Sequence, residues 1–149
     1  MAKPDPLLLD PARYPAHLEL TTRFQDLDWN LHLNNVPIAA LFEDARARYH
    51  WTTIGLREMM RAEERTMNAS VTVDYLAEMH YPAPVVAHVG VLSVGRTSWT
   101  VCGILAQEEK IGAFMRAIVV FTRKGTPAPL PDPLREALHG GQVRLESGV

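Results

Sequence analysis

The stretch FQDLDWNLHLNN, residues 24–35, decides the fold of this chain. It gathers carboxylates, side-chain amides and one imidazole, but it has none of the Gly, Pro or Ser residues that loops ordinarily use to turn the chain. Bulky apolar residues alternate with its polar ones: Leu27, Trp29, Leu31 and Leu33. This alternation predicts a packed segment with one side fixed in a core and the other turned toward something polar.

A long helical pattern follows directly, over residues 36–54. Its apolar residues recur at helical spacing and make one stripe: Ile38, Leu41, Phe42, Ala45 and Tyr49. Polar residues make up its other face: Glu43, Asp44, Arg46, Arg48 and His50. Asn34 or Asn35 can cap the start, Pro37 suits the first turn, and Gly55 can end the helix or the turn after it. The sequence therefore predicts one amphipathic helix of about five turns.

The rest of the chain predicts strands. Alternating or β-branched runs occupy five ranges: 16–25, 66–79, 85–95, 98–107 and 112–123. The last is apolar on both faces and is expected to be central, and short connections predict that the last four strands are antiparallel neighbours. One helix against one sheet is an α+β architecture. Outside it we expect an extended arm over 1–14, a proline-rich linker over 125–133, a helical turn at 134–139 and a loose tail.

Length and composition restrict the class of protein and the kinds of partner that we expect. A chain of 149 residues with 47% hydrophobic and 21% charged residues predicts one domain over 1–149, with its core over about 16–124. The net charge of −2 gives no support to a nucleic-acid partner. A single cysteine excludes an internal disulfide. The N-terminal segment has only three consecutive leucines between prolines, so we expect it to be neither a signal peptide nor a membrane span. We expect a cytoplasmic protein without a membrane partner.

The segment before the helix can support acyl chemistry. Free N–H groups of a first helical turn and the helix dipole can polarise a carbonyl oxygen, here through the amides of Asn35, Val36 and Ile38. A carboxylate opposite, Asp28, can attack that carbonyl or take a proton from water. Spacing alone equally allows Asp28 to make a turn hydrogen bond and His32 to be a half-buried structural histidine. Asp26 lies nearer the strand end and is expected to be structural.

Residues 23–35 resemble the signature region of hotdog-fold acyl thioesterases, both the 4-hydroxybenzoyl-CoA thioesterase-like group and the plant acyl-ACP thioesterases. The resemblance extends over about residues 16–124, and two weaker matches are the strand residues 73–76 and the turn 95–98. It implies a five-stranded antiparallel sheet wrapped around one long central helix. It also implies a homodimer or tetramer whose active sites lie at a subunit interface.

The resemblance also implies roles for residues. Asp28 matches the nucleophile or general base of the bacterial group, and Asn35 matches the amide that polarises the thioester carbonyl. Asp28, Asn30 and His32 match the D-x-N-x-H triplet of the plant group. Two features depart from these families, because the plant Glu-Cys pair has no counterpart and the Gly that often follows D-x-D is missing.

Other candidate catalytic and binding residues have less support from the sequence. Ser98 and Cys102 lack the context of a nucleophile, and the histidines show no metal-ligand spacing, so we expect no metal. Three cations at predicted strand ends can bind coenzyme A phosphates: Arg96, Arg123 and Lys124. Met59 and Met60 can line an acyl channel or fill the core.

These observations lead to one expected activity, the hydrolysis of an acyl thioester of coenzyme A or of acyl-carrier protein, without a cofactor other than the coenzyme A of the substrate. Two alternatives stay open. Hotdog folds also include acyl-thioester hydratases and dehydratases, and a non-catalytic acyl-binding protein would use residues 24–35 only as structure.

Overall fold

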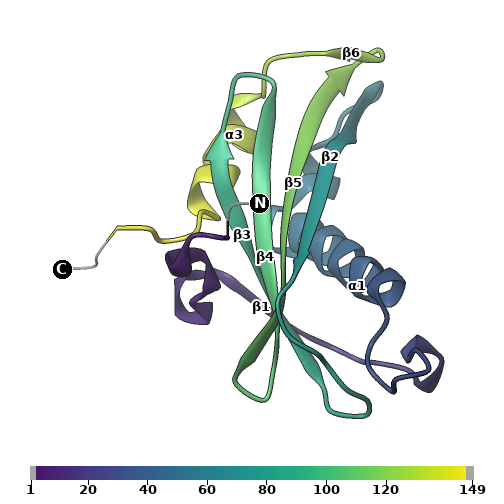
Figure 1. Cartoon of the computed structure of the whole chain (residues 1–149). Coiled ribbons are helices and arrows are strands. Elements are labelled where there is room, and N and C mark those ends of the chain that lie inside the picture. The colour runs from purple at the N-terminus through teal and green to yellow at the C-terminus, as the bar shows by residue number, and fades with distance from the viewer. Residues whose placement is uncertain (1–2, 147–149) are drawn as a thin grey trace.

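A computed structural model describes residues 3–146 (Figure 1). An antiparallel sheet has the strand order β1-β3-β4-β5-β2, and β6 pairs with the far end of β5. The strands are β1 (Ala16–Leu20), β2 (Glu64–Tyr75), β3 (Val85–Val94), β4 (Ser98–Gln107), β5 (Lys110–Arg123) and β6 (Thr126–Pro127). The α-helices are α1 (Asn35–Arg48), α2 (Leu56–Met59) and α3 (Asp132–Gly140). The expected α+β hotdog architecture, a curled antiparallel sheet around one long helix, is confirmed.

The pairing of β2 differs from expectation. β2 pairs with β5, from Glu64↔Arg123 to Tyr75↔Ala113, and not with its chain neighbour β3. β3 lies between β1 and β4 instead. The connection over 76–84 contains two prolines and is too long for a tight hairpin. It carries the chain from the edge of the sheet at β2 to the opposite half, where β3 pairs with β1 and β4. β5 is an interior strand between β4 and β2, in agreement with its prediction as a strand buried on both faces, and β2 is an edge strand.

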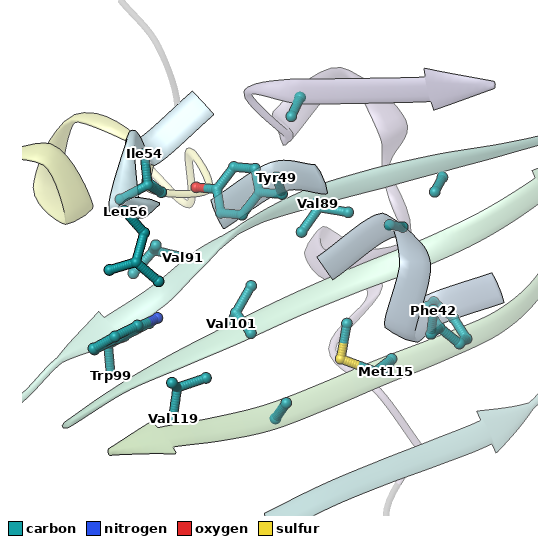
Figure 2. Close-up of a cluster of buried hydrophobic side chains, with 14 of the residues drawn as sticks. Phe42, Tyr49, Ile54, Leu56, Val89, Val91, Trp99, Val101, Met115 and Val119 are labelled. Carbon is teal, nitrogen blue, oxygen red and sulfur yellow. The ribbon is translucent and has the colours of Figure 1, made fainter. Parts of the chain in front are cut away.

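The stripe of α1 packs on one face of the sheet. Ile38, Phe42, Ala45 and Tyr49 are buried there, against β-strand residues such as Val89, Val101 and Met115 (Figure 2). After Arg48 the helix widens into a π-helical turn, Tyr49–Ile54, which ends at Gly55 in the left-handed region with φ +78°. Gly55 therefore terminates the helix as predicted, because glycine adopts this conformation without strain.

Two residues of the expected polar face are buried. His50 donates from Nδ1 to the Arg46 carbonyl oxygen (2.9 Å) and accepts at Nε2 from the Trp99 indole N–H (3.0 Å). Burial lowers the pKa of His50 to about 4, so the ring is neutral at pH 7. Arg46 is only 6% exposed. Hydrophobic periodicity could not predict the burial of these two residues, because it assigns every polar side chain to the surface.

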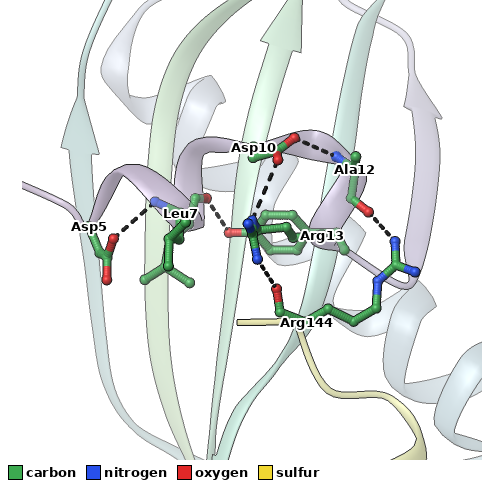
Figure 3. Close-up of polar contacts among 8 residues, drawn as sticks. Asp5, Leu7, Asp10, Ala12, Arg13 and Arg144 are labelled. Atoms are coloured by element: carbon green, nitrogen blue, oxygen red, sulfur yellow. Dashed lines mark hydrogen bonds and ion pairs between the residues drawn. The ribbon is translucent and has the colours of Figure 1, made fainter. Parts of the chain in front are cut away.

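The segments outside the hotdog core are more ordered than expected. Residues 6–13 form two 3₁₀ turns, and Tyr14 after them is buried with its hydroxyl donating to the Leu8 carbonyl oxygen (2.6 Å). Asp5 and Asp10 cap these turns through the N–H groups of Leu7 and Ala12 (Figure 3). Over residues 3–14 the expected extended arm is therefore wrong, because Pro6 and Pro11 each start a capped turn, while residues 1 and 2 lie outside the described residues.

The C-terminal segment is also packed. α3 is a nine-residue helix and not a single turn, and it buries Leu134 and Leu138 in the same core as α1. Beyond it, Val143 N–H donates to the Val91 carbonyl oxygen, and Arg144 joins the N-terminal turns through Arg13 and Ala12 (Figure 3). The expectation of a loose tail is wrong as far as Arg144, while 147–149 lie outside the described residues. Within residues 3–146, no helix is long and apolar enough to cross a membrane.

Candidate active site

The loop that carries Asp28 is fixed at its base. Asp26, 4% exposed, accepts from the Arg23 backbone N–H (2.9 Å) and from the Arg23 guanidinium at Nε (3.2 Å) and Nη2 (2.9 Å). Asn34 N–H donates to the Asp26 carbonyl oxygen (2.9 Å), and Leu33 N–H donates to that of Met79 (2.8 Å). These contacts agree with the structural role predicted for Asp26, and they fix both ends of residues 27–33.

Between these ends the chain makes a tight turn. Leu27 and Leu33 form an antiparallel bridge, Leu31 N–H donates to the Asp28 carbonyl oxygen (3.0 Å), and Leu31 has φ +62°. Trp29 is 94% exposed and Leu31 65% exposed, whereas Leu33 is buried. The prediction that all four apolar residues face the core is therefore wrong, because the turn at 28–31 places its tip in solvent.

The Asp28 carboxylate is held by the loop itself. Its Oδ1 accepts from the backbone N–H groups of Asn30 (2.8 Å) and His32 (3.2 Å). No carboxylate–cation pair of the described residues involves Asp28, and its Oδ2 accepts no hydrogen bond among them. The turn hydrogen bond that spacing allowed is thus present. It uses one carboxylate oxygen and leaves the second available for chemistry.

The start of α1 offers backbone donors. Ile38 N–H is used within the helix, since it donates to the Asn34 carbonyl oxygen (3.1 Å). Pro37 has no N–H, so the free donors are those of Asn35 and Val36, which donate to no acceptor among residues 3–146. The predicted set of three donors is therefore reduced to two.

Asp28 and the start of α1 border one hollow of about 310 Å³. The other residues that line it come from the loop, from α1 and from the segment after β2: His32, Leu33, Asn35, Ile38, Tyr75, Leu76, Ala77, Glu78 and Met79. His32 Nε2 lies 3.2 Å from Glu78 Oε2, and the His80 ring packs edge-on to the His32 ring at 5.3 Å between centroids. Asn30 does not line the hollow, and its side chain is exposed.

Sequence reasoning missed Glu78 and Tyr75. Tyr75 Oη donates to the Asn35 carbonyl oxygen (3.4 Å), which joins the end of β2 to the start of α1. Both residues lie more than 40 positions along the chain from Asp28, so no local spacing connects them. The polar residues after β2 were the available signal, because functional residues are often found on the loop that directly follows a strand.

The cations predicted to hold phosphates lie elsewhere. Arg123 Nη2 pairs with Glu64 (2.9 Å) at the end of the β2–β5 ladder, and Lys124 Nζ approaches Glu63 (3.9 Å) just beyond it. Arg96 is exposed in the turn between β3 and β4. None of the three lines the Asp28 hollow, and no Lys or Arg of the described residues does so.

The remaining candidates are structural. Cys102 is buried beside Tyr14, and burial raises the pKa of its thiol to about 11, which makes it a poor nucleophile. Ser98 begins β4. Within the described residues no group of three His, Cys, Asp or Glu side chains could hold a metal ion.

Comparison with known proteins agrees with this fold. A family model of the thioesterase-like superfamily matches residues 22–138. No curated protein matches the sequence. A thioesterase from Thermus thermophilus, solved in complex with coenzyme A and zinc, is 28% identical, with a TM-score of 0.74 over 86% of this chain and 95% of that one.

Two further structures are similar. A protein from Pseudomonas aeruginosa strain PAO1 is 26% identical, with a TM-score of 0.78 over 91% of this chain and 97% of that one. A gentisyl-coenzyme A thioesterase shares the fold at 14% identity, with a TM-score of 0.70 over 83% of this chain and 99% of that one.

Proposed function

Because the chain belongs to the thioesterase-like superfamily, we propose that it hydrolyses an acyl thioester whose thiol is coenzyme A. Water adds to the carbonyl carbon, the carbon–sulfur bond breaks, and a carboxylic acid and a thiol leave. The observation that carries this proposal is the hollow at the start of α1, where Asp28, His32 and Asn35 meet. The coenzyme A bound to the Thermus thermophilus thioesterase supports the choice of thiol.

Two parts of the site act on the thioester: the backbone N–H groups at the start of α1 and the Asp28 carboxylate. The thioester oxygen accepts from the free N–H groups of Asn35 and Val36, which stabilise the negative charge that develops on it, aided by the positive end of the α1 dipole. Asp28 takes a proton from the attacking water, and the departing thiolate later receives that proton. If Asp28 instead attacks the carbonyl, the carbon–sulfur bond breaks, the thiolate leaves and a mixed anhydride forms; water then hydrolyses the anhydride to the carboxylic acid and free Asp28.

His32 and Asn30 position Asp28. Their backbone N–H groups hold Oδ1 and so orient Oδ2. The His32 ring also borders the hollow, where it can bind the attacking water while Glu78 fixes the ring orientation. Asn30 acts through its backbone, so its side chain is dispensable.

The test measures thiol release from a panel of acyl-coenzyme A substrates. Asp28→Asn should lower kcat at least about 100-fold, because it removes the base or nucleophile but keeps the turn hydrogen bonds. Asp44→Asn, an exposed carboxylate on α1, is the matched control and should retain full activity. Unchanged turnover in Asp28→Asn excludes the mechanism, and an enoyl product without thiol release would indicate a hydratase or dehydratase.

We also propose that the protein is a homodimer joined along β2. This strand presents twelve residues at the sheet edge, and an unpaired edge of that length is a template for pairing with another strand. Its exposed apolar side chains, Met67, Val71 and Tyr75, favour a covered surface. The β2 edge adjoins the Asp28 hollow through Tyr75, so a second copy would border the site.

Light scattering on the purified protein tests this assembly. Val71→Lys should convert a dimer into a monomer, because it places a charge in the apolar interface. Leu7→Lys, on the N-terminal turns, is the control and should leave the mass unchanged. A wild-type protein that is monomeric at high concentration contradicts the dimer.

A further inference from the structure

A second hollow, of about 180 Å³, lies farther along the same side of α1. Arg46, on the helix, and two β2 residues, Thr66 and Asn68, line it. Arg46 is buried, yet its guanidinium donates no hydrogen bond and pairs with no carboxylate within 4 Å among residues 3–146. The guanidinium nitrogens open onto the hollow, so an anion that enters it can pair with this cation.

Glu43 does not supply that anion. It lies one turn before Arg46 and borders the same hollow, but its side chain is exposed and forms no ion pair with Arg46 among the described residues. Burial lowers the pKa of Arg46 and Glu43 only partly opposes this effect, which agrees with an incompletely compensated charge. The guanidinium, the Thr66 hydroxyl and the Asn68 amide instead offer the donors that a phosphate accepts.

The two hollows lie along one seam between α1 and β2. The Asp28 hollow is bounded by Asn35 on α1 and Tyr75 on β2, and the Arg46 hollow lies at the other end of both elements. Between them, at i+4 and i+3 spacing, α1 carries Ala39 and Glu43, both exposed. The helical rise separates Asn35 from Arg46 by about 16 Å along the axis.

This separation matches a thioester substrate. The pantetheine arm between the sulfur and its 4′-phosphate is a peptide-like chain of about 15 Å when extended. With the carbonyl on the Asn35 N–H, an arm that follows the seam reaches Arg46 with its phosphate. The Asp28 hollow holds carboxylates and no cation among the described residues, so the substrate's phosphate needs a cation elsewhere. Arg123 is paired with Glu64, which leaves Arg46 as the buried cation without an anion in the described part of the chain.

We propose that Arg46 binds the 4′-phosphate of the pantetheine arm, with Thr66 and Asn68 as further donors. This inference rests on the proposed thioesterase function. Coenzyme A and acyl-carrier protein both carry this phosphate, so the site recognises the chemistry that they share. The role is one of binding, and the chemical step stays with Asp28.

Binding of three unreactive probes tests the proposal without hydrolysis: coenzyme A, 4′-phosphopantetheine and pantetheine, measured by calorimetry. Arg46→Met should weaken the first two about 10- to 100-fold, the effect of losing charge-assisted hydrogen bonds, and leave pantetheine unchanged. Arg48→Met is the matched control on the same helix, since Arg48 already pairs with Asp44 (3.4 Å). Wild-type binding that is tighter for coenzyme A than for 4′-phosphopantetheine identifies coenzyme A as the source, and equal binding shows that the site recognises only the arm that coenzyme A and carrier protein share.

Two results overturn the proposal. One is equal affinity of Arg46→Met and the wild type for 4′-phosphopantetheine, and the other is an Arg46→Met protein that becomes monomeric, which assigns the missing anion to a second copy. Asn68→Ala, at an exposed position, gives a second variant if Arg46→Met fails to fold, and it should weaken 4′-phosphopantetheine about threefold to tenfold. Asp28→Asn should bind all three probes like the wild type, so loss of hydrolysis and loss of phosphate binding are separable.

Discussion

The His32 ring and the Glu78 carboxylate face each other at 3.2 Å on the rim of the Asp28 hollow, from two segments joined by no local sequence relationship. The pair is partly exposed, so we expect a modest contribution through ring orientation and not a large electrostatic one.

Glu78→Ala should therefore lower kcat about threefold to tenfold with little change in KM. His32→Ala should cost at least as much, and the double variant should cost no more than His32→Ala alone, because Glu78 acts through the ring. Steady-state kinetics of the four proteins provide the measurement. Additive losses would show that Glu78 contacts the substrate directly.

Loss of the hydrogen bonds between Arg23 and Asp26 should lower the free energy of unfolding more than loss of a surface ion pair does. Asp26→Asn should lower the free energy of unfolding by about 2–3 kcal/mol, because it removes charge-assisted hydrogen bonds from a buried carboxylate. Asp44→Asn, which removes an exposed pair with Arg48, should cost less than about 0.5 kcal/mol. Urea unfolding compares the two, and equal effects would mean that Asp26 does not fix the loop.

Buried His50 should make stability depend on pH. Its folded-state pKa of about 4 lies below its ordinary value of 6.5, so between these values the unfolded chain binds the extra proton. Stability is therefore full above pH 6.5 and falls as the pH drops toward 4, by up to about 3 kcal/mol from this residue. Urea unfolding at several pH values should show this loss in the wild type and a flatter profile in His50→Gln. Parallel profiles would exclude His50 as the cause.

Leu31 adopts a left-handed conformation that costs most residues free energy. Leu31→Gly should raise the free energy of unfolding by about 0.5–1 kcal/mol, since glycine takes this φ without a Cβ clash. Trp29→Gly, at the neighbouring position without a positive φ, should bring no gain. Thermal unfolding distinguishes the two, and a lower Tm for Leu31→Gly would contradict the turn geometry.

Local patterns predicted much of this fold. Helical spacing from Ile38 to Tyr49 located α1, and the apolar character of residues 112–123 identified β5 as central, because both follow from which side chains must be buried. The pairing of β2 with β5 could not be predicted in this way. It depends on where the chain returns after residues 76–84, which is a property of the whole sheet.

In the candidate site, too, some residues could be predicted from the sequence and others could not. Asp28 and Asn35 stand close together in the sequence, and their placement on one hollow follows from the turn and the helix start. Glu78 and Tyr75 reach that hollow only through tertiary structure. Arg46 was assigned to a polar face, because its burial depends on the position of the helix relative to β2 and not on its neighbours.

The hydrogen bond between Asn34 and Asp26 closes the loop and separates its two parts, the residues that hold Asp28 and the exposed residues at the tip. Asp28 and His32 are held from the backbone inside the closure, while the Trp29 and Leu31 side chains project from its tip and support nothing beneath them. The Trp29 side chain can therefore be replaced without disturbing how Asp28 is held, whereas position 31 favours residues that accept a positive φ.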